Sequence, residues 1–76
     1  MIPEHDQIVL TCDLPEHGLK AGDVGTVVYV HGDKGYEVEF MTWSGDTVAV
    51  VTVLKNQARP VGESEMHHAR PMEKHA

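Results

Sequence analysis

Histidine and carboxylate side chains are the residues of this sequence that could bind a metal ion. The chain has six histidines in 76 residues, and the adjacent imidazoles of His67 and His68 can reach one divalent cation. His17 follows Glu16 in a short polar segment that begins at Asp13. Structural zinc sites need four ligands, often cysteines and histidines at short loop spacings, and that spacing is absent. We expect these histidines to bind divalent metal only adventitiously. The alternative to the main function is that the chain is a metal-binding or metal-responsive protein that uses its histidines.

Nucleophilic or acid–base chemistry has weak support in the sequence. Ser44 lies in a turn-forming segment and lacks the flanking glycines of a nucleophile elbow. Glu37 and Glu39 share one face of an expected strand, about 7 Å apart, where exposure to water favours ordinary carboxylates over a tuned acid–base pair. The single cysteine, Cys12, can form no disulfide within the chain. We therefore expect no catalytic residue, no enzyme activity and no cofactor.

The charge balance restricts the partners. Twelve acidic residues against six basic ones give a formal net charge of -6, whereas binding to phosphate backbones needs clustered lysines and arginines. We expect no nucleic-acid partner, and Glu37 and Glu39 would steer a basic protein toward the chain. The longest apolar run, residues 48–54, is too short to cross a bilayer, and the first residues lack the pattern of a signal peptide. A reduced, cytoplasmic location without membrane contact fits best.

Five short segments rich in β-branched and aromatic residues alternate with glycine-containing turns, and no segment has helical periodicity. This arrangement is typical of a small all-β barrel, here a five-stranded SH3-like one. A single helical turn is expected at residues 56–58. The expected strands are residues 7–14, 24–31, 36–41, 47–54 and 59–61.

The long connection between the first two strands contains residues that bend the backbone. Pro15 cannot donate to a strand ladder and ends the first strand. Gly18 and Gly22 can adopt positive φ in the loop. Gly25 lies inside the second strand, where glycine marks a bulge or a close backbone approach. The need to reverse the chain between two strands explains these residues without any catalytic role. Leu19 is expected to close one end of the barrel.

Residues 1–61 and 62–76 differ in pattern. The first part carries the strands and turns of the barrel. The second part has no periodic apolar pattern and contains His67, His68 and two methionines. We expect one barrel domain, residues 1–61, followed by a flexible tail, residues 62–76.

The segment 47–54 is apolar on both faces, although a strand in a one-layer barrel has one wet face. We expect Val51 and Val53, with Ala49, to point outward and to contact a protein partner or a second copy of the chain. Trp43, the only tryptophan, lies beside this strand and could anchor the contact. Together with Glu37 and Glu39, these residues are the predicted interface.

Five short segments of the loop and strands form a recognisable pattern: Asp-Leu-Pro at 13–15, Gly-Leu at 18–19, Gly-Asp-Val-Gly-Thr-Val-Val at 22–28, Tyr-Glu-Val-Glu-Phe at 36–40 and Arg-Pro at 59–60. This pattern resembles a small bacterial family of stand-alone domains of unknown function. The resemblance covers roughly residues 8–61 and implies an SH3-like barrel without assigned chemistry. By analogy, small acidic chains of this kind are sometimes neutralising partners of toxins.

These features together predict a non-enzymatic protein-interaction module that associates through an apolar strand face, with itself or with a partner, in an antitoxin-like role. A second alternative is an accessory subunit of a larger enzyme, to which the chain would contribute a barrel and no catalytic residue.

Overall fold

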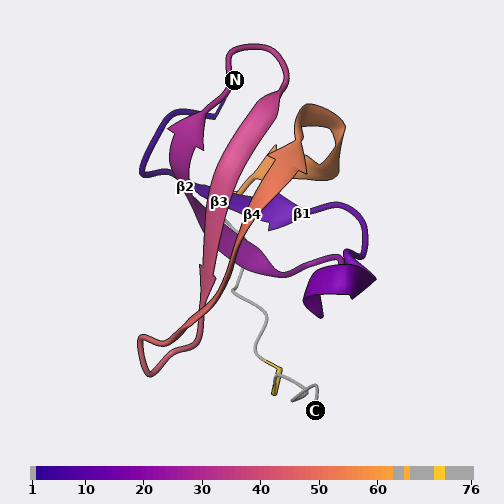
Figure 1. Ribbon diagram of the computed structural model, residues 1–76, viewed down its shortest axis with the longest axis vertical. Helices are drawn as coiled ribbons and strands as arrows, with labels where there is room; N and C mark the ends of the chain where they lie inside the picture. The colour runs from indigo at the N-terminus through magenta and orange to yellow at the C-terminus, as the bar shows by residue number, and fades with distance from the viewer. Residues whose placement is uncertain (1, 63–64, 66–69, 72–76) are drawn as a thin grey trace.

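All five strands join into one antiparallel sheet with the order β4-β3-β2-β1-β5 (Figure 1). The computed structural model describes residues 2–62, 65 and 70–71. Two short 3-10 helices interrupt the strands: η1 (Pro15–His17) follows β1, and η2 (Lys55–Gln57) follows β4. The strands are β1 (Gln7–Leu10), β2 (Val24–Val30), β3 (Gly35–Met41), β4 (Thr47–Leu54) and β5 (Ala58–Pro60).

The predicted elements are present, and β4 has the predicted bounds. The bounds of β2, β3 and β5 each differ from the expected ones by one residue, whereas the first strand ends at Leu10 and not at residue 14. At that point the backbone bonds to other segments: the Leu10 amide donates to the Asp23 carbonyl at 2.9 Å, and the Thr11 amide donates to the Gln57 carbonyl at 2.9 Å. Pro15 therefore begins η1 and does not end the strand. The predicted helical turn is η2, one residue earlier than expected.

The sheet is not closed into a barrel by strand pairing. Its two end strands are β4 and β5, and β5 pairs with β1. The chain passes from β4 to β5 through η2, which is tied to the end of β1 by the hydrogen bond from Thr11 to Gln57 and by one from the Thr11 hydroxyl to the Asn56 carbonyl. In Figure 1, β1 crosses behind β3 and β4, so the sheet folds over on itself around a shared core.

The core consists of inward-facing rows across β2, β3 and β4. Strand register aligns Val27, Val38 and Val51 in one row, and all three are buried. Tyr36 and Val53 form part of the next row. The same cluster includes side chains from β1 and the loop, which are Ile8, Leu10, Leu14 and Leu19, together with Ile2 and Phe40. Burial of these branched side chains supplies the main stabilisation of so small a domain.

The predicted orientation of β4 is wrong. Val51 and Val53 are 5% and 0% exposed and belong to the core, so neither is available to a partner. The outward side chains are Val50 and Leu54, which are 56% and 50% exposed. A period of two defines two faces of a strand but does not say which one faces inward. Thr52, between the two exposed residues, marks the wet face.

Glycines shape the loop and the second strand as expected. Gly18 and Gly22 adopt φ values of 69° and 94°. A Cβ at Gly25 would lie 2.5 Å from Cγ1 of Val38, so this position is a close approach between β2 and β3. The irregularity in β2 lies elsewhere, between Val27 and Tyr29.

Of the predicted tail, the structure describes Gly62, Glu65, Arg70 and Pro71. Glu65 accepts hydrogen bonds from Nη1 and Nη2 of Arg59, at 2.5 and 2.6 Å, and one from the amide of Gly62. The guanidinium of Arg59 and this amide lower the pKa of Glu65 to about 2. No helix in the described part of the chain is long and apolar enough to span a membrane.

The corrected orientation of β4 can be tested with two valines on the same strand. Val53→Ala removes fully buried methyl groups and is expected to lower the free energy of unfolding by about 2 kcal/mol. Val50→Ala trims a half-exposed side chain and should change it by less than about 0.5 kcal/mol. Urea unfolding of both variants measures the difference. Equal losses would contradict the assigned faces.

Candidate functional site

The outer face of the sheet, defined here as the side of β2, β3 and β4 turned away from the core, carries the exposed apolar residues. Strand register aligns Tyr29, Glu37 and Thr52 in one outward row. A second row aligns Thr26, Glu39 and Val50. Tyr29 is 54% exposed, and Leu54 lies at the far end of β4. The outer face therefore combines large apolar side chains with two carboxylates.

Each carboxylate of the outer face is held by a threonine of β4. The Thr52 hydroxyl donates to both oxygens of Glu37 at 2.9 Å, and the Thr47 hydroxyl donates to Oε2 of Glu39 at 2.8 Å. Nε2 of His31 lies 2.7 Å from Oε2 of Glu37. The hydrogen bonds from His31 and Thr52 hold the pKa of Glu37 below its ordinary value. Glu37 therefore keeps its negative charge into the acid range.

The ring of His31 also contacts Tyr29. The two ring centroids are 4.8 Å apart, with the planes at 68° in an edge-on arrangement. This contact links the exposed end of β2 to Glu37 on β3. Tyr29, His31 and Glu37 thus form one connected cluster on the outer face, in which an aromatic side chain lies next to an acidic one.

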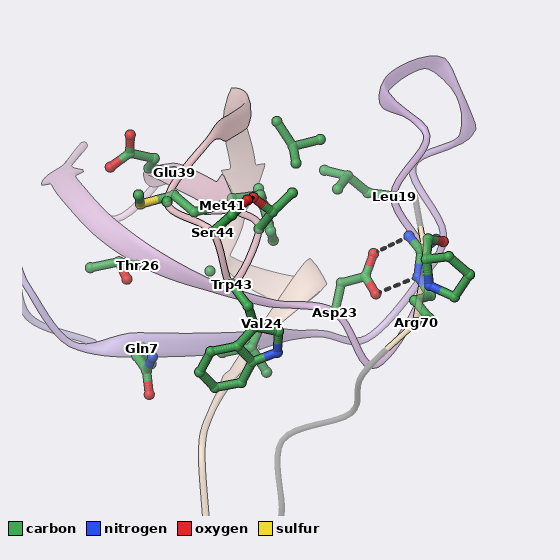
Figure 2. A pocket seen from close by; sticks show the side chains of 16 residues that line it. Gln7, Leu19, Asp23, Val24, Thr26, Glu39, Met41, Trp43, Ser44 and Arg70 are labelled. Carbon is green, nitrogen blue, oxygen red and sulfur yellow. Dashed lines mark hydrogen bonds and ion pairs between the residues drawn. The ribbon is translucent and has the colours of Figure 1, made fainter. Parts of the chain in front are cut away.

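A groove of about 680 Å³ opens beside the tip of the β3–β4 hairpin (Figure 2). Its apolar lining includes Met41, Trp43 and Val48. Trp43 is 84% exposed. In Figure 2 the Asp23–Arg70 pair lies on one side of this pocket and Glu39 on the other. The groove therefore offers an aromatic surface between two regions with carboxylates.

Polar contacts within the hairpin position Trp43. The Thr42 amide donates to the Asp46 carbonyl at 2.9 Å, and the Gly45 amide donates to the Thr42 carbonyl at 3.0 Å. The Ser44 hydroxyl donates to Oδ2 of Asp46 at 3.3 Å. Ser44 thus has the turn-forming contacts expected from the sequence, and these contacts fix the hairpin that carries Trp43.

The predicted interface residues separate into two groups. Glu37 and Glu39 lie together on the outer face, and Trp43 borders the groove, which Glu39 also lines. Val51 and Val53 lie on the opposite, inward side of the sheet. Sequence reasoning missed the exposed residues Tyr29, Val50 and Leu54. Thr52 was the available signal, because a polar residue in an apolar strand marks the side that faces water.

Of the three sequence-predicted metal residues, the structure describes His17 alone. Within residues 2–62, 65 and 70–71, no group of three histidine, cysteine or acidic side chains is placed to hold a metal ion. His17 is exposed in η1. His67 and His68 lie outside the described residues. Asp13, a proposed neighbour of His17, accepts a hydrogen bond from the Ala21 amide at 2.8 Å and so has a structural role in the loop.

One family model matches this chain. It is described as a domain of unknown function (DUF4926), and it matches residues 4–60. No curated protein and no solved structure is significantly similar to the chain. The match covers the five strands and ends at the last residue of β5, so the shared features are those of the sheet and its loops. It confirms the expected resemblance to a family of domains of unknown function.

The pKa of Glu37 leads to a pH prediction. Because the folded-state pKa is lower than the ordinary value of about 4.3, the bonds to Glu37 stabilise the fold fully above that pH, and this contribution is lost as pH falls through the folded-state pKa. Thr52→Ala should raise the pKa of Glu37, measured by NMR titration of its carboxyl carbon. Thr47→Ala, which alters the neighbour of Glu39, is the matched control and should leave the pKa of Glu37 unchanged. An unchanged pKa in Thr52→Ala would contradict the assignment.

Proposed function

We propose that this chain, which belongs to the family described as a domain of unknown function (DUF4926), is a non-enzymatic protein-interaction module that binds through its outer face. The exposure of Tyr29, Val50 and Leu54, each at least half exposed on one side of the sheet, carries the proposal. Large apolar side chains grouped on a surface and bordered by polar ones are typical of interaction sites. The proposal keeps the predicted role of β4 and changes the residues that perform it.

The charges of the outer face favour a basic partner over a second copy of the chain. Glu37 and Glu39 lie between the apolar residues of β2 and β4, and the chain has a formal net charge of -6. Two copies placed face to face would bring like charges together, which opposes association. A partner with lysine or arginine around an apolar patch would complement both features and would bind faster at low salt.

The carboxylates with shifted pKa values support a role without catalysis. A general acid at neutral pH needs a raised pKa, usually through burial. The pKa values of Glu37 and Glu65 are instead lowered by hydrogen bonds from His31, Thr52 and Arg59. Such carboxylates stay charged, which suits ion pairing with a partner.

We further propose that the fold is an SH3-like barrel left open between β4 and β5. Three features support this: the strand order, the long loop between β1 and β2, and the 3-10 helix η2 before β5. The antitoxin-like role, the accessory-subunit role and a cytoplasmic location stay predictions. Binding of metal by His17, His67 and His68 also stays a prediction.

The proposed contact can be tested by photocrosslinking in the native host. A photoreactive amino acid placed at Val50 should give a covalent adduct with one basic protein, identified by mass spectrometry. The same amino acid at Asp33, an exposed position in the β2–β3 turn, is the matched control and should give none. Adding Leu54→Glu to the Val50 variant should reduce the adduct at least about tenfold, because it places a charge in the apolar contact.

Three results would overturn the proposal. The first is the absence of an adduct at Val50, and the second is equal labelling from Val50 and Asp33. The third is an adduct with the mass of two copies of this chain, which would assign the outer face to self-association and exclude the foreign basic partner.

A further inference from the structure

Arg70 makes the most extensive side-chain contact between the described part of the tail and the sheet domain. Its Nε donates to Oδ1 of Asp23 at 2.8 Å, and its Nη2 donates to Oδ2 of Asp23 at 2.5 Å. The same Nη2 donates to the carbonyl of Gly18 at 3.0 Å. The side chains of Arg70 and Asp23 are only 17% and 12% exposed. Three acceptor atoms of Asp23 and Gly18 thus hold the guanidinium at a partly buried position, and its Nη1 also donates to the Pro71 carbonyl at 3.5 Å.

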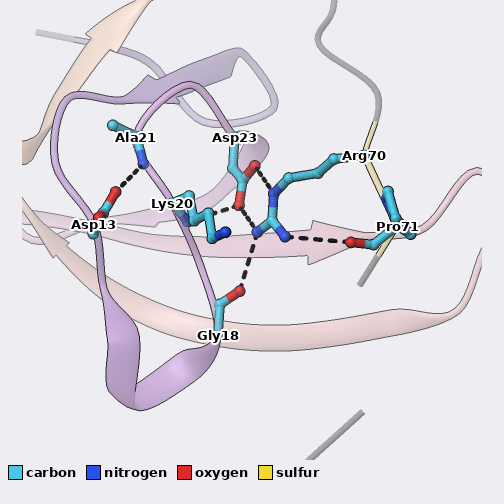
Figure 3. A network of polar contacts seen from close by, with 7 residues as sticks. All are labelled: Asp13, Gly18, Lys20, Ala21, Asp23, Arg70 and Pro71. Carbon is cyan, nitrogen blue, oxygen red and sulfur yellow. Dashed lines mark hydrogen bonds and ion pairs between the residues drawn. The ribbon is translucent and has the colours of Figure 1, made fainter. Parts of the chain in front are cut away.

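The loop between β1 and β2 holds these acceptors in place (Figure 3). Oδ2 of Asp23 also accepts a hydrogen bond from the Lys20 amide at 2.9 Å. Oδ1 of Asp13 accepts one from the Ala21 amide at 2.8 Å, so two carboxylates brace the same turn. Gly18, with its φ of 69°, provides the third acceptor through its carbonyl. The acceptors belong to a braced loop, and a guanidinium can bind there without reordering it.

We propose that Asp23 and the Gly18 carbonyl form an arginine-recognition site, which Arg70 fills within the chain and which an arginine of a basic protein segment fills by displacing Arg70. The acceptor atoms of this site belong to none of Tyr29, Val50 and Leu54, the residues that carry the proposed function.

The geometry selects arginine over lysine. Nε and Nη2 of Arg70 reach the two oxygens of Asp23 in parallel, which is the bidentate arrangement of a planar guanidinium. An ammonium group is a point charge and cannot form this pair together with the bond to Gly18 in one plane. Arginine is accordingly the side chain that uses all three acceptors.

The groove next to the site gives a displacing segment further contacts. Pro71 follows Arg70 and lines the same groove as Trp43 and Met41. A peptide whose arginine enters the site would place its next residues along this aromatic and apolar surface, where tryptophan and arginine contribute strongly to binding. The negative charge of the chain attracts such a basic segment.

In the isolated chain Arg70 occupies the site, and it therefore weakens the binding of an added arginine peptide. A tethered arginine competes at the effective concentration that its linker sets, and the apparent affinity for an added peptide falls with the fraction of sites that are accessible. Removing the tethered arginine should therefore strengthen binding of the added peptide.

The experiment uses the whole chain with Arg70→Gln, labelled with ¹⁵N. The probe is an acetylated peptide with the sequence of residues 68–74, and the matched control peptide has lysine in place of its arginine. The amide signals of Gly18, Lys20 and Asp23 should shift on addition of the arginine peptide. We expect binding to Arg70→Gln at least about fivefold tighter than to the wild-type chain, and about tenfold weaker binding of the lysine peptide.

A second variant tests the carboxylate. Asp23→Asn in the Arg70→Gln chain keeps an oxygen for the Lys20 amide and removes the charge, and it should abolish the shifts while the dispersed amide spectrum shows an intact fold. The proposal is overturned if folded Arg70→Gln shows no shifts at the loop or if the two peptides bind with equal affinity. It is also overturned if the chain with both Asp23→Asn and Arg70→Gln binds the arginine peptide as tightly as Arg70→Gln does. If the wild-type chain sediments as a dimer and Arg70→Gln sediments as a monomer, the site would instead bind the tail of a second copy.

Discussion

The alternation of side chains along β3 is the constraint on which the rest of the molecule depends. Tyr36, Val38 and Phe40 point into the core, and Glu37 and Glu39 point outward. Because β3 pairs with both β2 and β4, its register assigns the faces of these neighbours as well. The buried row through Val38 and the acidic outer face are therefore two results of one pattern, and a slip of one residue would exchange them.

The loop between β1 and β2 connects the core to the groove. Leu14 and Leu19 form a bridge between the two sides of the loop and are buried in the core cluster. Their anchoring leaves the polar residues between them at the surface, and Asp13 and Asp23, on either side of this bridge, accept hydrogen bonds from the Ala21 and Lys20 amides. Carboxylates that satisfy loop amides give the turn a defined shape without regular secondary structure. A loop that the sequence explained as a corner thus also presents oriented acceptors.

Local patterns in the sequence predicted most of the fold. The alternation of residues 36–41 and the glycine turns located β2, β3 and β4 to within a residue or two, because neighbouring hairpin strands depend on local signals. Long-range contacts were harder to predict from the sequence. For example, β1 ends early because the Thr11 amide bonds to the carbonyl of Gln57, 46 positions along the chain. The inward face of β4 is fixed by its pairing with β3, and the Arg70–Asp23 pair joins residues 47 positions apart. Neither follows from the periodicity of one segment.

The surroundings of β4 combine an exposed apolar edge, which favours self-association, with carboxylates that oppose it. It lies at one end of the strand order, where an apolar strand would invite pairing with a second copy. Its outward residues Val50 and Leu54 add an exposed apolar surface to that edge. Glu37 and Glu39, held by Thr52 and Thr47 of β4 itself, place negative charge against this surface. Like charges would meet in a pair of identical faces, so the acidic residues oppose face-to-face self-association, and they suit the basic partner that we propose.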